Sequence, residues 1–463
     1  MGMTKYVAGY TSDDIVLNHP LMTIQRNHKQ LGQIDAERID ANHSRYNHLA
    51  YALYIGNAVC DVLQNKERLN CARADIIQYI KIHDIGHPPY SHAVEYVLKA
   101  FTGQDHKQRS LALLDSDKKD SNKRTLRKVL QISGANIEGL KKLITGDDKA
   151  ASICNDKSIG VDKLAYTFKD AEICKFDQMP PDWEFLAPHL TLLDSYGIDI
   201  NKTQDQIEDQ IDILCAMQYF YFRMYTQVYL STKSLTYERH IQKAVELAIR
   251  SGIIDPNEIW EIGDDALIHS INNGITKRNM NPLIAQAKDI LRGYTDRKPY
   301  HSALAFKFKK GKLDIIDGQV LEVIDTKFKD NFLKTFENPL KLTELEDAIK
   351  KEMHVDILCS VLPDPEKVKP SDVPLYLENE KVSTLKIEAE DHYKRLNEMA
   401  DKHFSIRVLV PPSELEFVRR KHKDLSDCFK EQAQKIIDND QKRGLKKSLE
   451  TKSKANSIIR LHK

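Results

Sequence analysis

Three histidines and an aspartate fall within ten residues at the end of one predicted helix. The run IKIHDIGHPPYSHAVE contains His83, Asp84, His87 and His92, with Gly86 ahead of a diproline turn. A hydrolytic divalent metal ion uses mixed imidazole and carboxylate ligands and keeps positions open for water and a phosphate oxygen. Packing gives little reason for so many ionisable groups at a helix end. This run is therefore the first candidate for chemistry.

The His83-Asp84 pair carries little weight alone, because one such dipeptide is expected by chance in a chain with 17 histidines. Adjacent side chains on a helix point in different directions, so both reach one metal ion only from the helix end. Two further ligands must come from other helices, and His48 and Asp162 are the candidates. The alternatives are a hydrogen-bonded core histidine at 83 and a plain helix cap at 162.

The order of these residues resembles the HD-domain deoxynucleoside triphosphate triphosphohydrolases, including the SAM-and-HD-domain branch and bacterial dGTPase-like relatives. The likeness rests on RYNH at 45–48, HD at 83–84 followed by GHPPYSH, and GVDKLAYTFKD at 160–170. It covers most of the chain and omits the basic tail. The resemblance implies one divalent metal ion per site, chosen among Mn, Fe, Mg, Co, Ni and Zn. It assigns four metal ligands: His48, His83, Asp84 and Asp162.

The resemblance also implies where a nucleotide binds. Arg45 and Lys163 match phosphate-contacting positions, and a triphosphate with a charge of about −4 needs such cations. Tyr166 matches a tyrosine that lies against the sugar, and Asp170 with Gln30 matches the pair that binds the 3′-hydroxyl. A tyrosine packed on the ribose leaves no room for a 2′-hydroxyl, which favours deoxyribose. The alternatives are surface ion pairs for the cations and an ordinary core tyrosine.

A proton donor is needed because the leaving oxygen is a poor leaving group. His106 matches the catalytic histidine of the family, and Glu95 fits the position of its acidic partner, with Asp105 as a competing candidate. A histidine with a pKa of about 6.5 donates a proton at neutral pH, and a carboxylate keeps it charged and oriented. His87 and His92 would line the phosphate path. Each of these histidines also has a structural or surface alternative.

The chain departs from the family pattern in places that concern nucleotide binding. His19-Pro20 is followed by QLG at 30–32 almost at once, and the intervening family segment contributes to an allosteric nucleotide site. The resemblance therefore does not extend to activation by GTP or dGTP. The acidic residue that often follows the catalytic histidine is Lys107 here. An arginine expected eight residues before Tyr229 is replaced by Tyr221, although Arg223 is near.

Helices must position most of these residues. Apolar periodicity predicts helices over 46–63 and 73–83 and two long helices within 206–251. After residue 300 the expected strands 313–323, 355–362, 373–377 and 406–410 alternate with the expected helices 342–353 and 389–402. The sequence thus predicts a mainly α protein: a helical HD-domain core in residues 1–300, a smaller C-terminal α+β lobe in 301–425, and a basic tail, helical or frayed, in 426–463.

Composition bounds the function class. Of 463 residues, 41% are hydrophobic and 30% charged, which is typical of a globular protein and excludes a disordered one. The net charge of +1 favours no charged partner globally. The sequence has no signal peptide and no apolar run of about 18 residues, so we expect no membrane partner. Seven dispersed cysteines without a CxxC pair indicate reduced thiols and a cytoplasmic protein.

Three functions remain open on the sequence. The first is hydrolysis of a dNTP by metal-activated water at the α-phosphorus, which releases deoxynucleoside and inorganic triphosphate. The second is an HD-type phosphodiesterase or phosphatase on another nucleotide, because fold resemblance alone does not fix the substrate. The third is a regulator that binds nucleotide or nucleic acid through the lysines and arginines of residues 441–463. The expected partners are the nucleotide substrate and further copies of this chain in a homo-oligomer.

Overall fold

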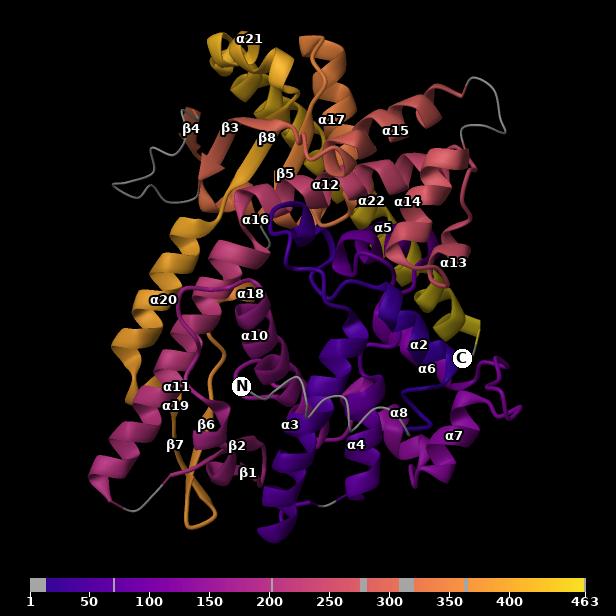
Figure 1. Cartoon of the computed structure of the whole chain (residues 1–463). Helices are drawn as coiled ribbons and strands as arrows, with labels where there is room; N and C mark the ends of the chain where they lie inside the picture. Colours follow the sequence, from indigo (N-terminus) through magenta and orange to yellow (C-terminus); the bar gives the residue numbers. More distant parts are fainter. Residues whose placement is uncertain are drawn as a thin grey trace. The chain divides into compact units, whose positions relative to one another are not determined.

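The computed structural model describes residues 14–69, 71–200, 203–274, 281–307, 320–361 and 365–461. These residues are mainly helical with two small sheets, which confirms the expected fold class (Figure 1). The chain divides into two compact units. The first unit comprises Met1–Arg297 and Pro365–Ala400, and the second comprises Lys298–Asp364 and Asp401–Lys463.

Three packed helices carry the candidate metal ligands in the first unit. Helix α3 (Arg45–Asn65) packs against both α4 (Arg73–Ile82) and α10 (Val161–Ile173) (Figure 1). Helix α3 begins where it does because the Ser44 side chain accepts a hydrogen bond from the Asn47 amide. Its inward face joins the main core of the unit. The predicted helices over 46–63 and 73–83 are confirmed.

A turn and two short helices follow α4. Tyr90 and Ser91 both have positive φ, 55° and 54°, and lead into α5 (His92–Thr102). This left-handed turn is costly for non-glycine residues, and the Tyr90 amide is held by a 2.9 Å hydrogen bond to Asp264 Oδ1. Helix α6 (His106–Leu114) starts at a capping box formed by Asp105 and Gln108.

The predicted long helices within 206–251 are also confirmed. Helix α11 (Gln204–Met224) passes into a π-helical turn, Tyr225–Tyr229, and then into α12 (Thr232–Arg250). A π-helical turn rotates the following side chains relative to a regular helix and is frequent at functional sites. Here it directs two tyrosines toward α10.

The sheet of the first unit joins strands that are far apart in the sequence. Its order is β1 (Leu190–Leu192), β2 (Tyr196–Asp199), β6 (Pro374–Leu377) and β7 (Glu380–Thr384). The expected strand 373–377 exists as β6, but its partner is β2, with buried Ile198 opposite buried Leu375. For this reason residues 365–400, including most of α20 (Glu390–His403), belong to the first unit rather than to the C-terminal part of the chain.

The sheet of the second unit has the order β4 (Val320–Val323), β3 (His301–Lys307), β8 (Ile406–Val410) and β5 (Leu358–Val361). Helices α16 (Thr326–Phe336), α17 (Pro339–Met353) and α22 (His422–Leu461) pack together beside it. Phe306 stacks on Phe429 at 4.5 Å between ring centroids. The expected strand 313–323 is observed over 320–323, and residues 313–319 lie outside the described residues, as does residue 362.

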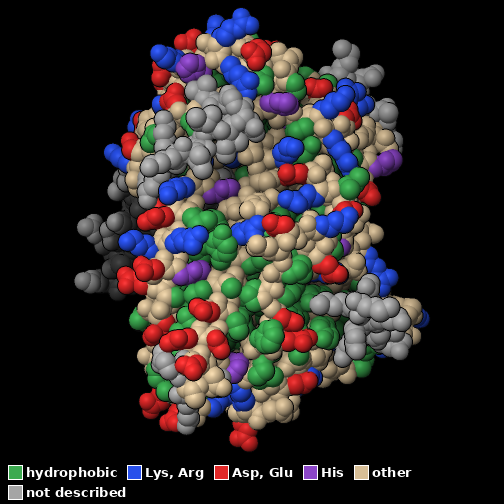
Figure 2. All heavy atoms as spheres, turned by 60° about the vertical axis from the view of Figure 1, so that its left-hand side comes forward, with side chains coloured by type: hydrophobic (Ala, Val, Ile, Leu, Met, Phe, Trp, Pro, Cys, Tyr) green, Lys and Arg blue, Asp and Glu red, His purple; other side chains and the backbone are tan. Residues whose placement is uncertain are grey.

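The remaining helices are α2 (Pro20–Thr23), α7 (Leu126–Ile132), α8 (Ile137–Thr145), α9 (Ala151–Asn155), α13 (Pro256–Ile259), α14 (Asp264–Asn273), α15 (Pro282–Thr295), α18 (Pro365–Val368), α19 (Leu385–Glu388) and α21 (Leu415–Arg420). Among the described helices, none combines the length and apolar character needed to cross a bilayer. Figure 2 shows both acidic and basic side chains on the face drawn.

Candidate active site and metal centre

His48, His83 and Asp162 form a compact group that we call the ligand triad. His48 lies on α3, His83 is the C-cap of α4, and Asp162 lies in the first turn of α10. Asp162 Oδ1 is 3.0 Å from His48 Nε2 and 3.3 Å from His83 Nε2. All three donor atoms lie within 4.8 Å of one another, so they can share one ion.

The donor atoms of the triad fit a divalent cation. His83 Nδ1 donates to the Ile80 carbonyl over 2.8 Å, which aims its Nε2 at Asp162. His48 is fully buried, and neither of its ring nitrogens has a hydrogen-bond partner among the described residues. Its Nε2 lies 3.0 Å from Asp162 Oδ1 without a hydrogen bond between them. A metal ion would bind both of these atoms.

Charge also favours a cation at the triad. Burial alone would lower the pKa of His83, but Asp84 and Asp162 raise it to about 9. Burial would raise the pKa of Asp162, but the neighbouring His48 and His83 rings hold it well below its usual range. The carboxylates are thus ionised and attract positive charge, which a divalent ion supplies in place of a proton.

Asp84 lies beside the triad but farther from its centre. Its Oδ2 is 3.9 Å from His48 Nε2, and its Oδ1 is 3.6 Å from His83 Nε2. The same carboxylate forms an ion pair with Arg45. Burial opposes ionisation, yet the adjacent His83 and Arg45 charges hold the pKa of Asp84 well below its usual value. Asp84 is close enough to His48 and His83 to share an ion with them, and its role as a fourth ligand stays a prediction.

Arg45 is almost fully buried and already engaged. Besides its ion pair with Asp84, its Nε donates to Ser91 Oγ over 3.0 Å. Arg45 therefore lies beside the triad, and its contact with a phosphate stays a prediction. In this arrangement its guanidinium ties the start of α3 to the turn before α5.

A second group, which we call the histidine–glutamate cluster, consists of His87, His92, Glu95 and His106. Glu95 Oε1 is 2.6 Å from His106 Nδ1 and accepts the His106 amide over 2.9 Å. Glu95 Oε2 is 2.9 Å from His92 Nδ1. The His87 and His106 rings stack at 4.3 Å with an angle of 11°. The structure thus brings together the expected proton donor His106, its acidic partner Glu95 and the two histidines expected to line the phosphate path.

The four residues of the cluster differ in pKa and in exposure to solvent. Burial would raise the pKa of Glu95, but hydrogen bonds from His106 and His92 hold it far below its usual range. Burial and the Arg45 charge lower the pKa of His87 to about 3, so this ring is neutral. The His92 side chain is 62% exposed and that of His106 26%. Asp105, the competing candidate, caps α6 instead.

Two of the expected sugar-binding residues, Tyr166 and Asp170, lie on α10, and the third, Gln30, lies ahead of α3. Asp170 Oδ1 is 2.9 Å from His43 Nε2, and Asp170 Oδ2 accepts a 2.8 Å hydrogen bond from Tyr229. The Gln30 amide donates to the His43 carbonyl over 2.8 Å, and Gln30 Oε1 is buried without a partner in the described part of the chain. The sequence reasoning missed His43, whose only signal is its place two residues before Arg45.

Lys163 faces three tyrosine rings. Its Nζ lies 4.5 Å from the ring centre of Tyr221, 4.6 Å from that of Tyr225 and 5.2 Å from that of Tyr166. The Lys163 charge is the main cause that lowers the pKa of Tyr225. Tyr221, which replaces an expected arginine, therefore makes a cation–π contact where an arginine would repel.

Arg223 does not take over the place of that arginine. Its guanidinium lies 3.0 Å from Asp177 and 4.9 Å from the ring centre of Phe176. These contacts engage it with the segment that follows α10.

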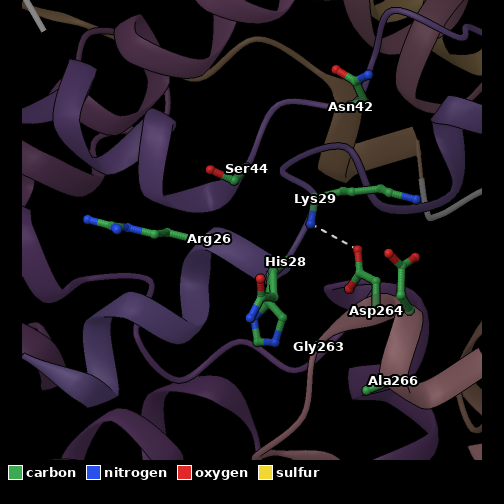
Figure 3. Close-up of a pocket in the computed structure, with 10 residues that line it drawn as sticks. Arg26, His28, Lys29, Asn42, Ser44, Gly263, Asp264 and Ala266 are labelled. Carbon is green, nitrogen blue, oxygen red and sulfur yellow. Dashed lines mark hydrogen bonds between the residues drawn. The ribbon is translucent and has the colours of Figure 1, made fainter. Parts of the chain in front are cut away.

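A cavity of about 390 Å³ is lined in part by Lys29 and Ser44, which directly precede Gln30 and Arg45 in the sequence. Lys29, His28 and Arg26 approach it from one segment and Asp264 from α14, as Figure 3 shows. It is lined by Arg26, Asn27, His28, Lys29, Asn42, Ser44, Gly263, Asp264, Asp265 and Ala266. Asp264 Oδ2 accepts the Lys29 amide over 2.9 Å, and burial raises the pKa of Asp264 to about 6. This lining includes no member of the triad.

Comparison by sequence finds a distant relative of this chain. No protein-family model matches the chain. An uncharacterized protein from Methanocaldococcus jannaschii is 23% identical over 374 residues, which cover 78% of this chain and 74% of that protein.

Two solved structures share the fold. A hypothetical protein from Aquifex aeolicus has a TM-score of 0.60 at 17% identity, covering 88% of this chain and 94% of its own. A phosphohydrolase from Bacteroides thetaiotaomicron has a TM-score of 0.59 at 14% identity, covering 86% of this chain and 94% of its own. The chain therefore has a fold that a phosphohydrolase also has.

Proposed function

We propose that this protein is a metal-dependent phosphohydrolase that cleaves deoxynucleoside triphosphates to deoxynucleoside and inorganic triphosphate. The observation that carries the proposal is the ligand triad, in which one Asp162 oxygen lies 3.0 and 3.3 Å from two imidazole Nε2 atoms. A divalent ion bound there would polarise a phosphate oxygen and make water nucleophilic at neutral pH. The fold shared with a phosphohydrolase supports the same reaction class.

The histidine–glutamate cluster supplies the proton. Attack of water at the α-phosphorus breaks its bond to the 5′-oxygen, which must leave as a hydroxyl. His106 donates that proton, and Glu95, 2.6 Å from His106 Nδ1, orients the ring and stabilises its charged form. The hydroxyl from water stays on the triphosphate, and the lost water proton passes to solvent.

The residues of α10 position the substrate. Lys163, whose ammonium group lies over three tyrosine rings, attracts the phosphates. Tyr166 lies one turn after Asp162, and Asp170 one turn further, so a sugar beside the metal reaches both. Asp170 with Gln30 binds the 3′-hydroxyl, and Tyr166 excludes a 2′-hydroxyl.

A specific observation favours a second candidate, a phosphatase or phosphodiesterase on a nucleotide with fewer phosphates. Arg45 is engaged by Asp84, Tyr221 stands in place of an arginine, and Arg223 binds Asp177. A substrate with fewer phosphates carries less negative charge and would need fewer arginine side chains to bind it. The regulator that binds nucleic acid through residues 441–463 stays a prediction, because the side chains from 444 onward lie outside the described residues.

The deciding experiment is a substrate panel with purified protein and Mn²⁺. Each dNTP, each ribonucleotide and each deoxynucleoside monophosphate is incubated separately, and inorganic triphosphate, phosphate and nucleoside are quantified. We expect nucleoside and triphosphate in equal amounts from dNTPs. Release of phosphate from monophosphates, with no turnover of any dNTP, would show that the substrate assignment is wrong. It would not contradict the proposed metal site. Light scattering of the same sample tests the predicted homo-oligomer.

A further inference from the structure

The histidine–glutamate cluster contains more potential metal donors than proton transfer requires. Its three imidazoles and one carboxylate each offer one atom, and all four atoms lie within 4.8 Å of one another. We propose that this cluster binds a second divalent transition-metal ion, separate from an ion at the ligand triad. The bound ion blocks proton transfer and so inhibits the enzyme.

Two perpendicular imidazoles converge on one carboxylate oxygen. His92 Nδ1 lies 2.9 Å and His87 Nδ1 3.9 Å from Glu95 Oε2. The two rings are 4.9 Å apart between centroids at an angle of 86°. Ligands that approach from perpendicular planes suit the tetrahedral coordination of Zn²⁺, with bonds of about 2.0–2.2 Å. Small side-chain rotations would bring these three atoms to that distance.

One of these nitrogens is buried and unpaired. His87 is 4% exposed, and its Nδ1 has no hydrogen-bond partner among the described residues. Its Nε2 lies 3.4 Å from Asp84 Oδ1 and donates its proton there, so Nδ1 directs a lone pair toward the Glu95 carboxylate. Two electron-rich groups that face each other repel unless a cation lies between them. This arrangement is the second, independent indication of an ion at the cluster.

The site is distinct from the ligand triad and open to solvent. Nε2 and Nδ1 lie on opposite sides of the His87 ring, so the ring stands between Asp84 and Glu95. His92 and His106 are 62% and 26% exposed, which gives an ion a route of entry. Because the His106 ring stacks nearly parallel to that of His87, it must turn to become the fourth ligand.

The ligand set selects the metal. Three imidazoles with one carboxylate favour Zn²⁺, Co²⁺ or Ni²⁺ over Mg²⁺, which prefers oxygen ligands and retains water. An ion bound by Glu95 and His106 would replace the proton on His106 Nδ1, so the ring could no longer form the charged proton donor that Glu95 stabilises. The predicted inhibition rests on the proposed function, whereas binding of the ion does not.

The experiment counts ions directly. Full-length protein is freed of metal, dialysed against Zn²⁺ and analysed by elemental analysis, and its affinities are measured by calorimetry. We expect two ions per chain in wild type and one in His83→Ala, which retains the cluster. His92→Gln should weaken one of the two ions by about tenfold or more and spare the other. His301→Gln, an exposed histidine of the second unit, should keep both ions.

Two further measurements keep the inference falsifiable. Because His92 is exposed, His92→Gln should not disturb the core, and circular dichroism with thermal melting checks this. His106→Ala should shift the Co²⁺ absorption spectrum of the second ion. The inference would be overturned if wild type bound a single ion that His83→Ala lost. It would also be overturned if the affinity of the second ion were the same in wild type, His92→Gln and His106→Ala. Two ions without dNTP turnover would refute only the proposed function.

Discussion

Glu95 Oε1 contacts His106 twice, at the ring Nδ1 over 2.6 Å and at the backbone amide over 2.9 Å. One carboxylate oxygen thereby fixes both the orientation of the imidazole and the start of α6. Gly86 supports the same arrangement, because a Cβ there would come within 2.0 Å of the His106 carbonyl. Two contacts with one carboxylate oxygen therefore orient the proposed proton donor, although its side chain is partly exposed.

Removal of a triad ligand should abolish turnover. In His83→Ala an ion at the triad would lose a donor whose orientation depends on the Ile80 carbonyl. Since such an ion would contribute several kcal/mol at the transition state, we expect kcat to fall by about three orders of magnitude. Steady-state kinetics with bound-metal analysis measures this. His301→Ala serves as the control, and an active, metal-free His83→Ala would refute the assignment.

Glu95→Gln should lower kcat by about 100-fold and should change its pH profile. The amide keeps the shape but cannot stabilise the charged His106 ring, so the alkaline limb of the profile, where the donor loses its proton, should move to lower pH. KM should change little, because Glu95 does not contact substrate in the proposal. An equal rise in KM with constant kcat would indicate a binding role instead.

The same variant predicts a stability effect with a defined sign. The pKa of Glu95 is depressed in the folded protein, so its stabilising contribution is present above the unfolded pKa of about 4.3. That contribution is lost as the pH falls through the lower folded value. Urea unfolding should therefore show a difference between wild type and Glu95→Gln that is large at pH 7 and shrinks below about pH 4. A difference that grows on acidification would contradict the hydrogen-bond assignment.

Asp264 should show the opposite pH dependence. Its pKa is raised to about 6 by burial, against about 3.9 when unfolded, so its contribution is fully present below the unfolded value and lost as the pH rises through 6. Relative to Asp264→Asn, wild type should lose about 2 kcal/mol of unfolding free energy between pH 4 and pH 7. Denaturant titrations at both pH values test this, and a flat difference would refute the raised pKa.

Tyr166→Ala should relax sugar selectivity. The ratio of kcat/KM for dATP over ATP should fall by about tenfold or more, because removal of the ring makes room for a 2′-hydroxyl. Tyr225→Phe is a matched control, since it keeps the ring beside Lys163 and removes only the hydroxyl, which contacts that of Tyr166 at 3.3 Å and the Lys163 ammonium. Unchanged selectivity in Tyr166→Ala would exclude the proposed sugar contact.

The sequence by itself determined the fold class and the local runs of chemistry. Helix α3 and the run from His83 to His92 depend on neighbours within a few residues, which apolar periodicity and residue spacing show directly. The resemblance added Glu95 as the partner of His106, and the structure brings the two into contact.

Only the tertiary structure decided contacts between distant residues. Sequence patterns show that β6 is a strand but not that it pairs with β2, and they show an ionisable Arg45 but not its ion pair with Asp84. His43 near Asp170 was likewise missed. The physical reason is that hydrogen-bond and packing preferences are local, whereas these pairs depend on the path of the whole chain and on the burial that it creates.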